Sequence, residues 1–187
     1  MLDGFGGIHP TGGAPPPACP CPYWQGWNIA RSFDLVPNTV SGVTLDGYGG
    51  IGPWGSPNVD RTGSPYWQGW DIARGVDLVP VGLGYGGVTL DGYGGIHKWG
   101  GAVVNTTGSP YWGGFDIGRD LTVLSGGGGG YTLDGYGGIG RWGSAGSTSG
   151  NPYFSGVDWF RGMTLNPNQT GGYTIDRYGG IYPFTIP

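Results

Sequence analysis

Two short motifs recur in phase along this chain of 187 residues, and their spacing constrains the fold more than any other feature. The first motif, Leu-Asp-Gly-aromatic-Gly-Gly-Ile, occurs five times if one degenerate copy is counted, and its aspartates are Asp3, Asp46, Asp91, Asp134 and Asp176. The second motif runs from Pro-Tyr-aromatic to an arginine and occurs four times, with its arginines at Arg31, Arg74, Arg119 and Arg161. Successive aspartates are 43, 45, 43 and 42 residues apart, and successive arginines are 43, 45 and 42 apart. Such self-similarity is the signature of a tandem-repeat architecture.

The amino-acid composition favours a repeat built from β-strands over one built from helices. The chain contains 46 Gly and 16 Pro, no Glu and one Lys, so an all-helical fold is excluded. Its 9 Trp, 12 Tyr and 6 Phe carry too much apolar surface for a solvated tail. Each Gly-Gly pair separates two short extended runs, which is typical of a β-hairpin.

A longer run such as 70–79 predicts a third strand in each repeat, and Pro-Tyr-Trp predicts a short fourth strand at a sheet edge. We therefore expect an all-β, β-propeller-like fold with four full four-stranded units plus an extra terminal hairpin. The expected organisation is a single repeat domain over 1–187. Its approximate units are 1–43, 44–88, 89–131 and 132–174, with a partial unit at 175–187.

The chain resembles a known type of repeat. Gly-Gly-Tyr-Thr-Leu-Asp-Gly-Tyr-Gly-Gly-Ile (129–139) together with Tyr-Trp-Gln-Gly-Trp-Asp-Ile-Ala-Arg (66–74) is similar to the tandem repeats of large secreted bacterial proteins. The resemblance covers nearly the whole chain and implies a propeller-like fold, but it supplies no catalytic residues. Departures occur at the ends, where Thr11 stands in place of a repeated tryptophan and Arg177 in place of the motif glycine. Terminal repeats are often atypical because they cap or join.

The motif aspartates and arginines are the most regular charged residues. We expect them to form hydrogen-bonded ion pairs that tie one strand to the next, for example Asp91 with Arg74 or Arg119. A ring of such ions around a channel that binds an anion or a sugar is the alternative, and the structural interpretation is preferred because catalytic groups are seldom repeated. A second set, Asn28, Asp71, Asp116 and Asp158, is expected to accept backbone N–H bonds at turns.

The repeated aromatic residues are candidate sugar-stacking platforms, since flat rings with a polar edge suit carbohydrate faces. They are Tyr23, Trp24, Tyr66, Trp67, Tyr111, Trp112 and Tyr153. Core packing is the preferred interpretation for all of them. His9 and His97 share one repeat position that is not histidine in the other copies, so no role is assigned to them.

Cys19 and Cys21 leave three alternatives open, which are a local disulfide, half of a metal site, or two links to other chains. No second Cys or His cluster completes a zinc site, so no metal is expected. Asn105 and Asn168 begin acceptor sequences for N-glycosylation. A net charge of −4 with dispersed arginines argues against nucleic acid as a partner, and no apolar run is long enough for a membrane span.

These features together predict a non-catalytic extracellular or cell-surface structural protein, a scaffold or fibre subunit joined through incomplete terminal repeats. Its expected partners are further copies of itself or neighbouring repeats of a longer chain. The alternative is a lectin-like, carbohydrate-binding propeller with one aromatic site per repeat. No enzyme motif is present, and although the chain has 12 acidic residues, no carboxylate pair stands in a distinctive context, so neither an enzyme nor a cofactor is expected.

Overall fold

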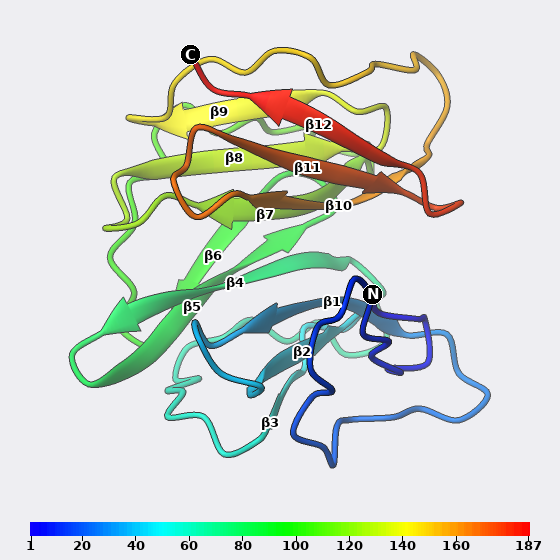
Figure 1. Cartoon of the computed structure of the whole chain (residues 1–187), viewed down its shortest axis with the longest axis vertical. Coiled ribbons are helices and arrows are strands. Elements are labelled where there is room, and N and C mark those ends of the chain that lie inside the picture. The colour runs from blue at the N-terminus through cyan, green and yellow to red at the C-terminus, as the bar shows by residue number, and fades with distance from the viewer. The chain divides into compact units, whose positions relative to one another are not determined.

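The computed structural model describes all 187 residues and contains β-strands but no helix, which confirms the all-β prediction (Figure 1). The strands form four separate three-stranded sheets, in the orders β1-β2-β3, β4-β5-β6, β7-β8-β9 and β10-β11-β12. The strands are β1 (Ala30–Leu35), β2 (Gly42–Asp46), β3 (Ile51–Trp54), β4 (Ala73–Val81), β5 (Gly84–Asp91), β6 (Ile96–Trp99), β7 (Gly118–Val123), β8 (Gly129–Asp134), β9 (Ile139–Gly143), β10 (Phe160–Leu165), β11 (Gly171–Asp176) and β12 (Ile181–Thr185).

The prediction of four strands in each repeat is wrong, because the Pro-Tyr-aromatic segment is not a strand. In the second repeat, Pro65 has no N–H to donate, and Gly69 turns the chain with φ +78°. The N–H of Trp70 then bonds back to the carbonyl of Trp67 at 2.9 Å. The segment therefore makes a tight turn where the sequence predicted an edge strand.

The first motif forms the hairpin that was expected from it. Leu45 pairs with Ile51 across the turn between β2 and β3, and Leu133 pairs with Ile139 between β8 and β9. The surplus terminal hairpin is the N-terminal one, since residues 2–8 form an isolated antiparallel bridge between Leu2 and Ile8 and belong to none of the four sheets. The last motif copy lies between β11 and β12 and so completes the fourth sheet.

An irregularity in the first strand falls on the motif arginine. In β1, Ala30 pairs with Asp46 and Ser32 with Leu45, so Arg31 is the extra residue of a bulge. The pairing of β7 with β8 shifts in the same way at Arg119. The pairing of β10 with β11 does so at Arg161. Because a bulge redirects one side chain out of the strand's alternation, it frees these arginines to reach beyond their own sheet.

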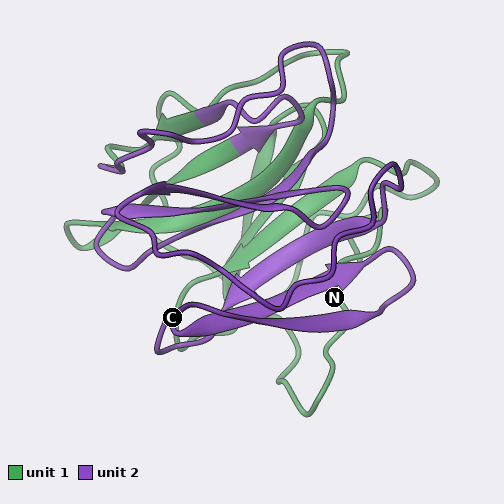
Figure 2. Ribbon diagram, turned by 90° about the horizontal axis from the view of Figure 1, so that it is seen from above, with its two compact units in different colours: residues 1–89, 97–102 green, residues 90–96, 103–187 purple.

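The chain divides into two compact units, drawn in different colours in Figure 2. One consists of 1–89 and 97–102, and the other of 90–96 and 103–187. The first holds the sheet β1-β2-β3 and most of β4-β5-β6, and the second holds the other two sheets. Each unit has its own core, which includes Leu45, Val76 and Trp99 in the first and Leu133 and Phe160 in the second. The single repeat domain expected from the sequence stays a prediction.

A buried hydrogen bond between a tryptophan and a threonine recurs in three sheets. The indole N–H of Trp54 donates to the hydroxyl of Thr44 at 3.1 Å. Trp99 and Thr89 make the same bond at 3.0 Å. Trp142 and Thr132 make it at 3.1 Å. The fourth sheet has Phe184 in this place, and its threonine, Thr174, instead donates to the Oδ1 of Asn151 at 2.6 Å. The constant spacing of ten residues between the threonine and the ring is a sequence signal that was missed.

Replacing the tryptophan and its threonine together should cost less than the sum of the two single replacements. Trp142→Phe leaves the Thr132 hydroxyl buried without its donor and should lower the free energy of unfolding of the intact chain by about 2 to 4 kcal/mol. Adding Thr132→Val removes the orphaned hydroxyl, so the double variant should lose less than the sum of the two single variants. Chemical denaturation of all four proteins measures this coupling, and strict additivity would contradict it.

Candidate functional site

The candidate site is the junction between successive repeats, and it begins with the turn of the first motif. We call the five residues from the motif aspartate to the second glycine the glycine turn. In residues 46–50, the Oδ1 of Asp46 accepts the N–H groups of Tyr48 at 2.8 Å and Gly50 at 2.9 Å. The other four motif aspartates, Asp3, Asp91, Asp134 and Asp176, hold their turns with the same two bonds at 2.8 to 2.9 Å. These aspartates therefore shape the backbone.

Each of the first four glycine turns is bound by the second motif that follows it, which we call the docking segment. For the turn at 46–50 the docking segment is 65–74. The carbonyl of Tyr48 accepts the N–H of Trp67 at 2.7 Å, and the carbonyl of Gly47 accepts the N–H groups of Ile72 at 2.8 Å and Ala73 at 3.0 Å. The turns at 3–7, 91–95 and 134–138 are bound in the same way by 22–31, 110–119 and 152–161. A turn of one repeat is thus joined to the next by backbone hydrogen bonds outside any sheet.

The close approach explains one glycine in each turn. A Cβ on Gly49 would lie 2.5 Å from the carbonyl oxygen of Pro65 and 3.1 Å from the ring of Trp67. This residue also has φ +91°, a conformation that L side chains rarely adopt. Trp67 fills the space above the turn and is half-buried there. The repeated tryptophan of the docking segment therefore packs, as the preferred interpretation expected.

Arginines close the junction, but with other partners than the sequence predicted. Asp71 accepts hydrogen bonds from the Nε of Arg31 at 2.9 Å and from a terminal nitrogen of Arg74 at 3.0 Å. Asp158 binds Arg119 at 2.8 Å and 2.9 Å and Arg161 at 2.7 Å. The same Arg–Asp–Arg bridge thus occurs once in each compact unit.

The contacts above join these arginines to Asp71, Asp116 and Asp158, and the expected pairing of Asp91 with Arg74 or Arg119 stays a prediction. Asp71, Asp116 and Asp158 had been assigned to backbone N–H groups, whereas their carboxylates bind arginine. The second set therefore binds arginine side chains, and the glycine-turn aspartates bind the backbone of their own turns. The signal for the true partner is that each of these aspartates lies three residues before an arginine.

The bridge holds its carboxylates ionised. Burial alone would raise the pKa of Asp71, but the hydrogen bond and charge of Arg31, with the charge of Arg74, outweigh it and lower the pKa. The pKa of Asp158 is lowered by the same balance, with Arg119 and Arg161 as the cations. The carboxylate side chains remain 39% and 40% exposed, so water screens part of this attraction.

A second link joins the first strands of neighbouring sheets within each compact unit. In one unit, the Oδ2 of Asp34 in β1 accepts the N–H of Leu78 in β4 at 2.8 Å. In the other, the Oδ2 of Asp120 in β7 accepts the N–H of Met163 in β10 at 2.8 Å, and these strands lie side by side in Figure 1. Burial raises the pKa of Asp34, although hydrogen bonding to Asp77 and to the backbone opposes the rise.

No group of three or more His, Cys, Asp or Glu side chains is placed to hold a metal ion.

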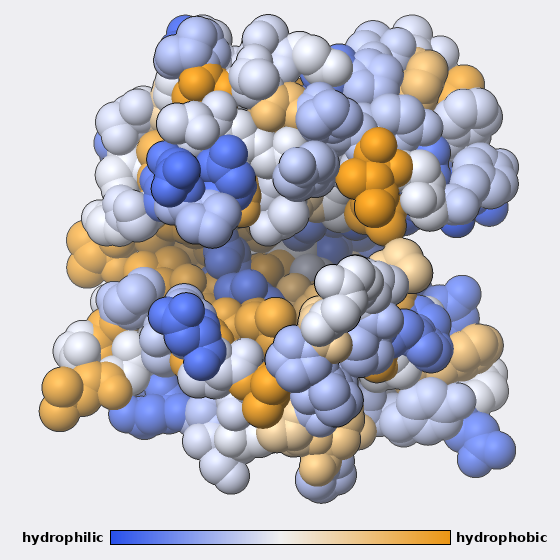
Figure 3. Space-filling view, in the orientation of Figure 1, coloured by the Kyte–Doolittle hydropathy of each residue, from blue (hydrophilic) through white to orange (hydrophobic).

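The tyrosines of the docking segments face the solvent. Tyr23, Tyr66, Tyr111 and Tyr153 are 61%, 61%, 67% and 58% exposed, so core packing is wrong for these four residues. In the first three docking segments a second aromatic residue four positions after the tyrosine is about half exposed, as in Trp27 at 48% and Phe115 at 49%. Trp27 meets Tyr48 of the next glycine turn edge to face, with ring centroids 5.6 Å apart. On the face drawn in Figure 3, strongly apolar residues form small separate patches among polar ones.

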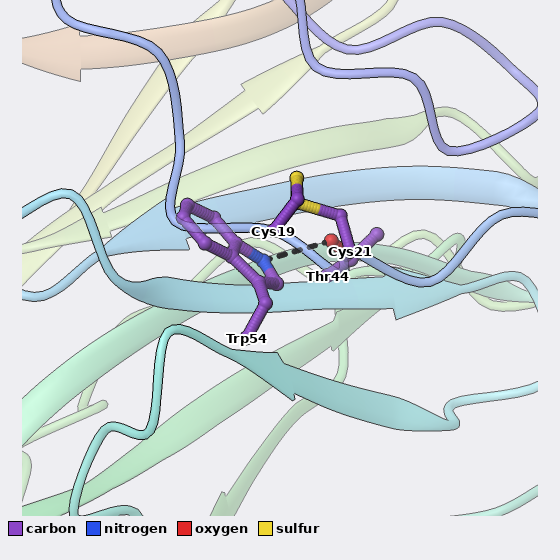
Figure 4. Close-up of a disulfide and its surroundings, with 4 residues drawn as sticks. All are labelled: Cys19, Cys21, Thr44 and Trp54. Carbon is purple, nitrogen blue, oxygen red and sulfur yellow. Dashed lines mark hydrogen bonds between the residues drawn. A yellow bond between two sulfur atoms is a disulfide. The ribbon is translucent and has the colours of Figure 1, made fainter.

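The two cysteines form a disulfide between Cys19 and Cys21, with the sulfur atoms 2.07 Å apart. Figure 4 shows it near the Trp54–Thr44 hydrogen bond. The disulfide lies in the segment that packs on β3 and its end, where a Cβ on Gly52 would meet Pro22 at 2.5 Å and one on Gly55 would meet Ala18 at 3.0 Å. The glycosylation candidates Asn105 and Asn168 are both exposed.

The first and last glycine turns carry an extra side-chain contact that sequence reasoning missed. The Nε2 of His9 lies 2.8 Å from the Oδ2 of Asp3, and the hydroxyl of Tyr182 donates to the Oδ2 of Asp176 at 2.8 Å. These residues occupy the position that holds glycine in two other copies. The hydrogen bond from His9 lowers the pKa of Asp3. Both contacts therefore strengthen the turns at the two ends of the repeat series.

Comparison with known proteins finds no protein-family model that matches this chain and no matching curated protein. The chain also has no helix with the length and apolar character that a membrane crossing requires.

Neutralising the bridging carboxylate should weaken the junction in a pH-dependent way. Asp71→Asn removes the charge that two arginines share and should lower the free energy of unfolding by about 1 to 2 kcal/mol at pH 7, after allowance for solvent screening. Because the folded-state pKa of Asp71 is lowered, its contribution is present above the pKa of the unfolded chain and is lost as the pH falls through the folded value. The difference between the two proteins should therefore shrink on acidification. Asp60→Asn, in an exposed loop, is the control, and an equal loss in both variants would contradict the bridge.

Proposed function

We propose that this chain is a non-catalytic structural scaffold that acts outside the cell or at its surface, built from propeller-like β-repeats that associate with further repeats. The single observation that carries the proposal is the junction itself. The most regular polar residues of the sequence lie in its glycine turn, docking segment and Arg–Asp–Arg bridge. There they hold neighbouring repeats together.

The charged residues support a structural role. The glycine-turn aspartates bind their own backbone, and Asp71 and Asp158 each bind two arginines. A catalytic carboxylate needs a site of its own with a perturbed pKa and room for a substrate. Repetition of the same contacts at each junction instead gives a series that can be extended, as in other repeat proteins.

A propeller-like arrangement is consistent with the way that the first strands meet. β1 neighbours β4, and β7 neighbours β10, while β3, β6, β9 and β12 form the other edges of their sheets. The first strand of a propeller blade lies innermost, so such neighbours are the expected arrangement. An extracellular setting is supported by the disulfide, since such bonds persist in oxidising compartments.

Assembly is the direct test of the scaffold. Multi-angle light scattering over a concentration series, combined with negative-stain microscopy, should show oligomers of this chain with a regular repeat. A chain that stays strictly monomeric at its highest soluble concentration would contradict the proposal.

A second candidate function, carbohydrate binding, is favoured by the exposure of the docking-segment tyrosines. Four equivalent rings that are 58% to 67% exposed recur at successive junctions. Flat, exposed rings with a hydroxyl can stack on sugar faces, and repetition of weak sites raises the overall affinity. The half-buried Trp67 and Trp112 are poorer stacking platforms, because their rings approach the glycine turn.

This candidate predicts a defined loss of binding. On a glycan array, Tyr66→Ala combined with Tyr111→Ala should weaken binding by about tenfold or more, since two stacking contacts are lost. Tyr173→Ala removes a ring of β11 that is 51% exposed but lies outside the docking segments, so it is the matched control. Absence of binding to any glycan, or equal binding by both variants, would contradict a lectin-like role.

A further inference from the structure

The last glycine turn, 176–180, has the same internal structure as the other four, but no segment of the described chain packs on its outer face. The Oδ1 of Asp176 accepts the N–H groups of Tyr178 and Gly180, each at 2.8 Å. Tyr178 is 71% exposed. A Cβ placed on Gly179 would have no atom within 4 Å. The turn is therefore fully formed, and its outer face is open.

The same position is covered in the other four copies. A Cβ on Gly6, Gly49, Gly94 or Gly137 would lie 2.3 to 2.5 Å from the carbonyl oxygen of the proline that begins the following docking segment. The ring of Trp24, Trp67, Trp112 or Phe160 lies 2.5 to 3.1 Å from that Cβ. In four glycine turns this face is covered by a docking segment. In the fifth turn the same face is exposed.

We propose that the glycine turn 176–180 is a self-association site whose occupant is the docking segment 22–31 of a second copy of this chain. The inference rests on the scaffold function proposed above and names the contact that joins the copies. Tyr178 and Arg177 would present the two carbonyl groups that accept the N–H groups of Trp24, Ile29 and Ala30, as Tyr48 and Gly47 do for the next segment of their own chain.

The segment 22–31 suits this role because its present partner belongs to none of the four sheets. Residues 3–7 of the same chain now bind it through the carbonyls of Gly4 and Phe5. These residues belong to a hairpin with one bridge, between Leu2 and Ile8, whereas 176–180 joins two strands of a three-stranded sheet. Exchange of one turn for the other would replace a hairpin outside the sheets by a turn that joins two sheet strands, with the same hydrogen bonds to the docking segment.

Asn28 explains why the docking segment 22–31, among the four, can bind a turn that contains Arg177. A Cβ on Gly4, the equivalent of Arg177, would lie 2.0 Å from the Oδ1 of Asn28. Asn28 is exposed, and its amide oxygen accepts one long hydrogen bond, from Arg31 at 3.4 Å, so less holds it in place than an ion pair would. In two later docking segments, the corresponding Asp71 and Asp158 are each fixed between two arginines and cannot move as easily.

Arg161 supplies the charge that the new junction would use. Arg31 and Arg119 each reach the aspartate of the following repeat, and the side chain of Arg119 is 11% exposed. Arg161 binds only Asp158 of its own repeat among carboxylates and is 37% exposed. In the assembled pair, its guanidinium would donate to the amide oxygen of Asn28 from the second copy.

Two substitutions in the intact chain should move association in opposite directions. Arg177→Gly restores the residue found in the other four turns, so it should lower the concentration at which oligomers form by about tenfold, the effect of one relieved close contact. Gly179→Ala puts a methyl group where the Pro22 carbonyl must lie and should abolish association. Gly126→Ala is the control, because Gly126 has a similar φ of +84° and no atom near its Cβ, yet lies in a different loop. Light scattering over a concentration series gives the mass, and circular dichroism verifies the fold.

If one of these variants is unstable, releasing the docking segment 22–31 from the turn 3–7 gives an independent measurement. A Cβ on Gly6 would lie 2.3 Å from the carbonyl oxygen of Pro22, so Gly6→Ala should release the hairpin 2–8 and promote association. Gly179→Ala in that background should reverse the gain. Oligomers that persist in Gly179→Ala would overturn the assigned site and leave the scaffold function standing. A monomeric intact chain together with monomeric Arg177→Gly and Gly6→Ala variants would overturn both, and would exclude a second copy as the occupant.

Discussion

The docking of a glycine turn onto the segment that follows it is the contact on which the rest of the structure depends. Each sheet has only three strands of four to nine residues, the smallest number of strands that can be stable alone, so packing between sheets adds much of its stability. The turn carbonyls, the Pro carbonyl packed over the motif glycine and the Arg–Asp–Arg bridge attach one small sheet to the next. Each repeat therefore contributes both a folded sheet and the contacts that join this sheet to the next one.

Two adjacent residues of the docking segment have opposite environments, one packed and one exposed. Trp67 turns inward and covers the glycine turn, while Tyr66 beside it is 61% exposed. The bulge at the arginine of the first strand belongs to the same arrangement, because it directs the guanidinium of Arg31 to Asp71 of the next repeat. One segment of ten residues thus builds the joint and leaves a ring on the surface at every junction.

Periodicity predicted the all-β class, the glycine hairpins and the atypical ends, since these depend on residues close together in sequence. It could not predict contacts between elements. Arg31 and Asp71 are 40 residues apart, and the only local hint of their contact is that Asp71 lies three residues before another motif arginine, Arg74. The Pro-Tyr-aromatic segment has strand-like composition, but its hydrogen bonds go to a turn of the preceding repeat, so a strand count from propensity gave four where the structure has three.

The most direct test compares two glycines of the second junction in the intact chain. Gly49→Ala places a methyl group 2.5 Å from the Pro65 carbonyl oxygen, whereas Gly69→Ala, with a similar positive φ of +78°, meets no atom within 4 Å. Both should lose about 1 to 2 kcal/mol of unfolding free energy through backbone strain. If turn docking holds the repeats together, Gly49→Ala should lose at least about 2 kcal/mol more in chemical denaturation. Equal losses at the two positions would contradict it.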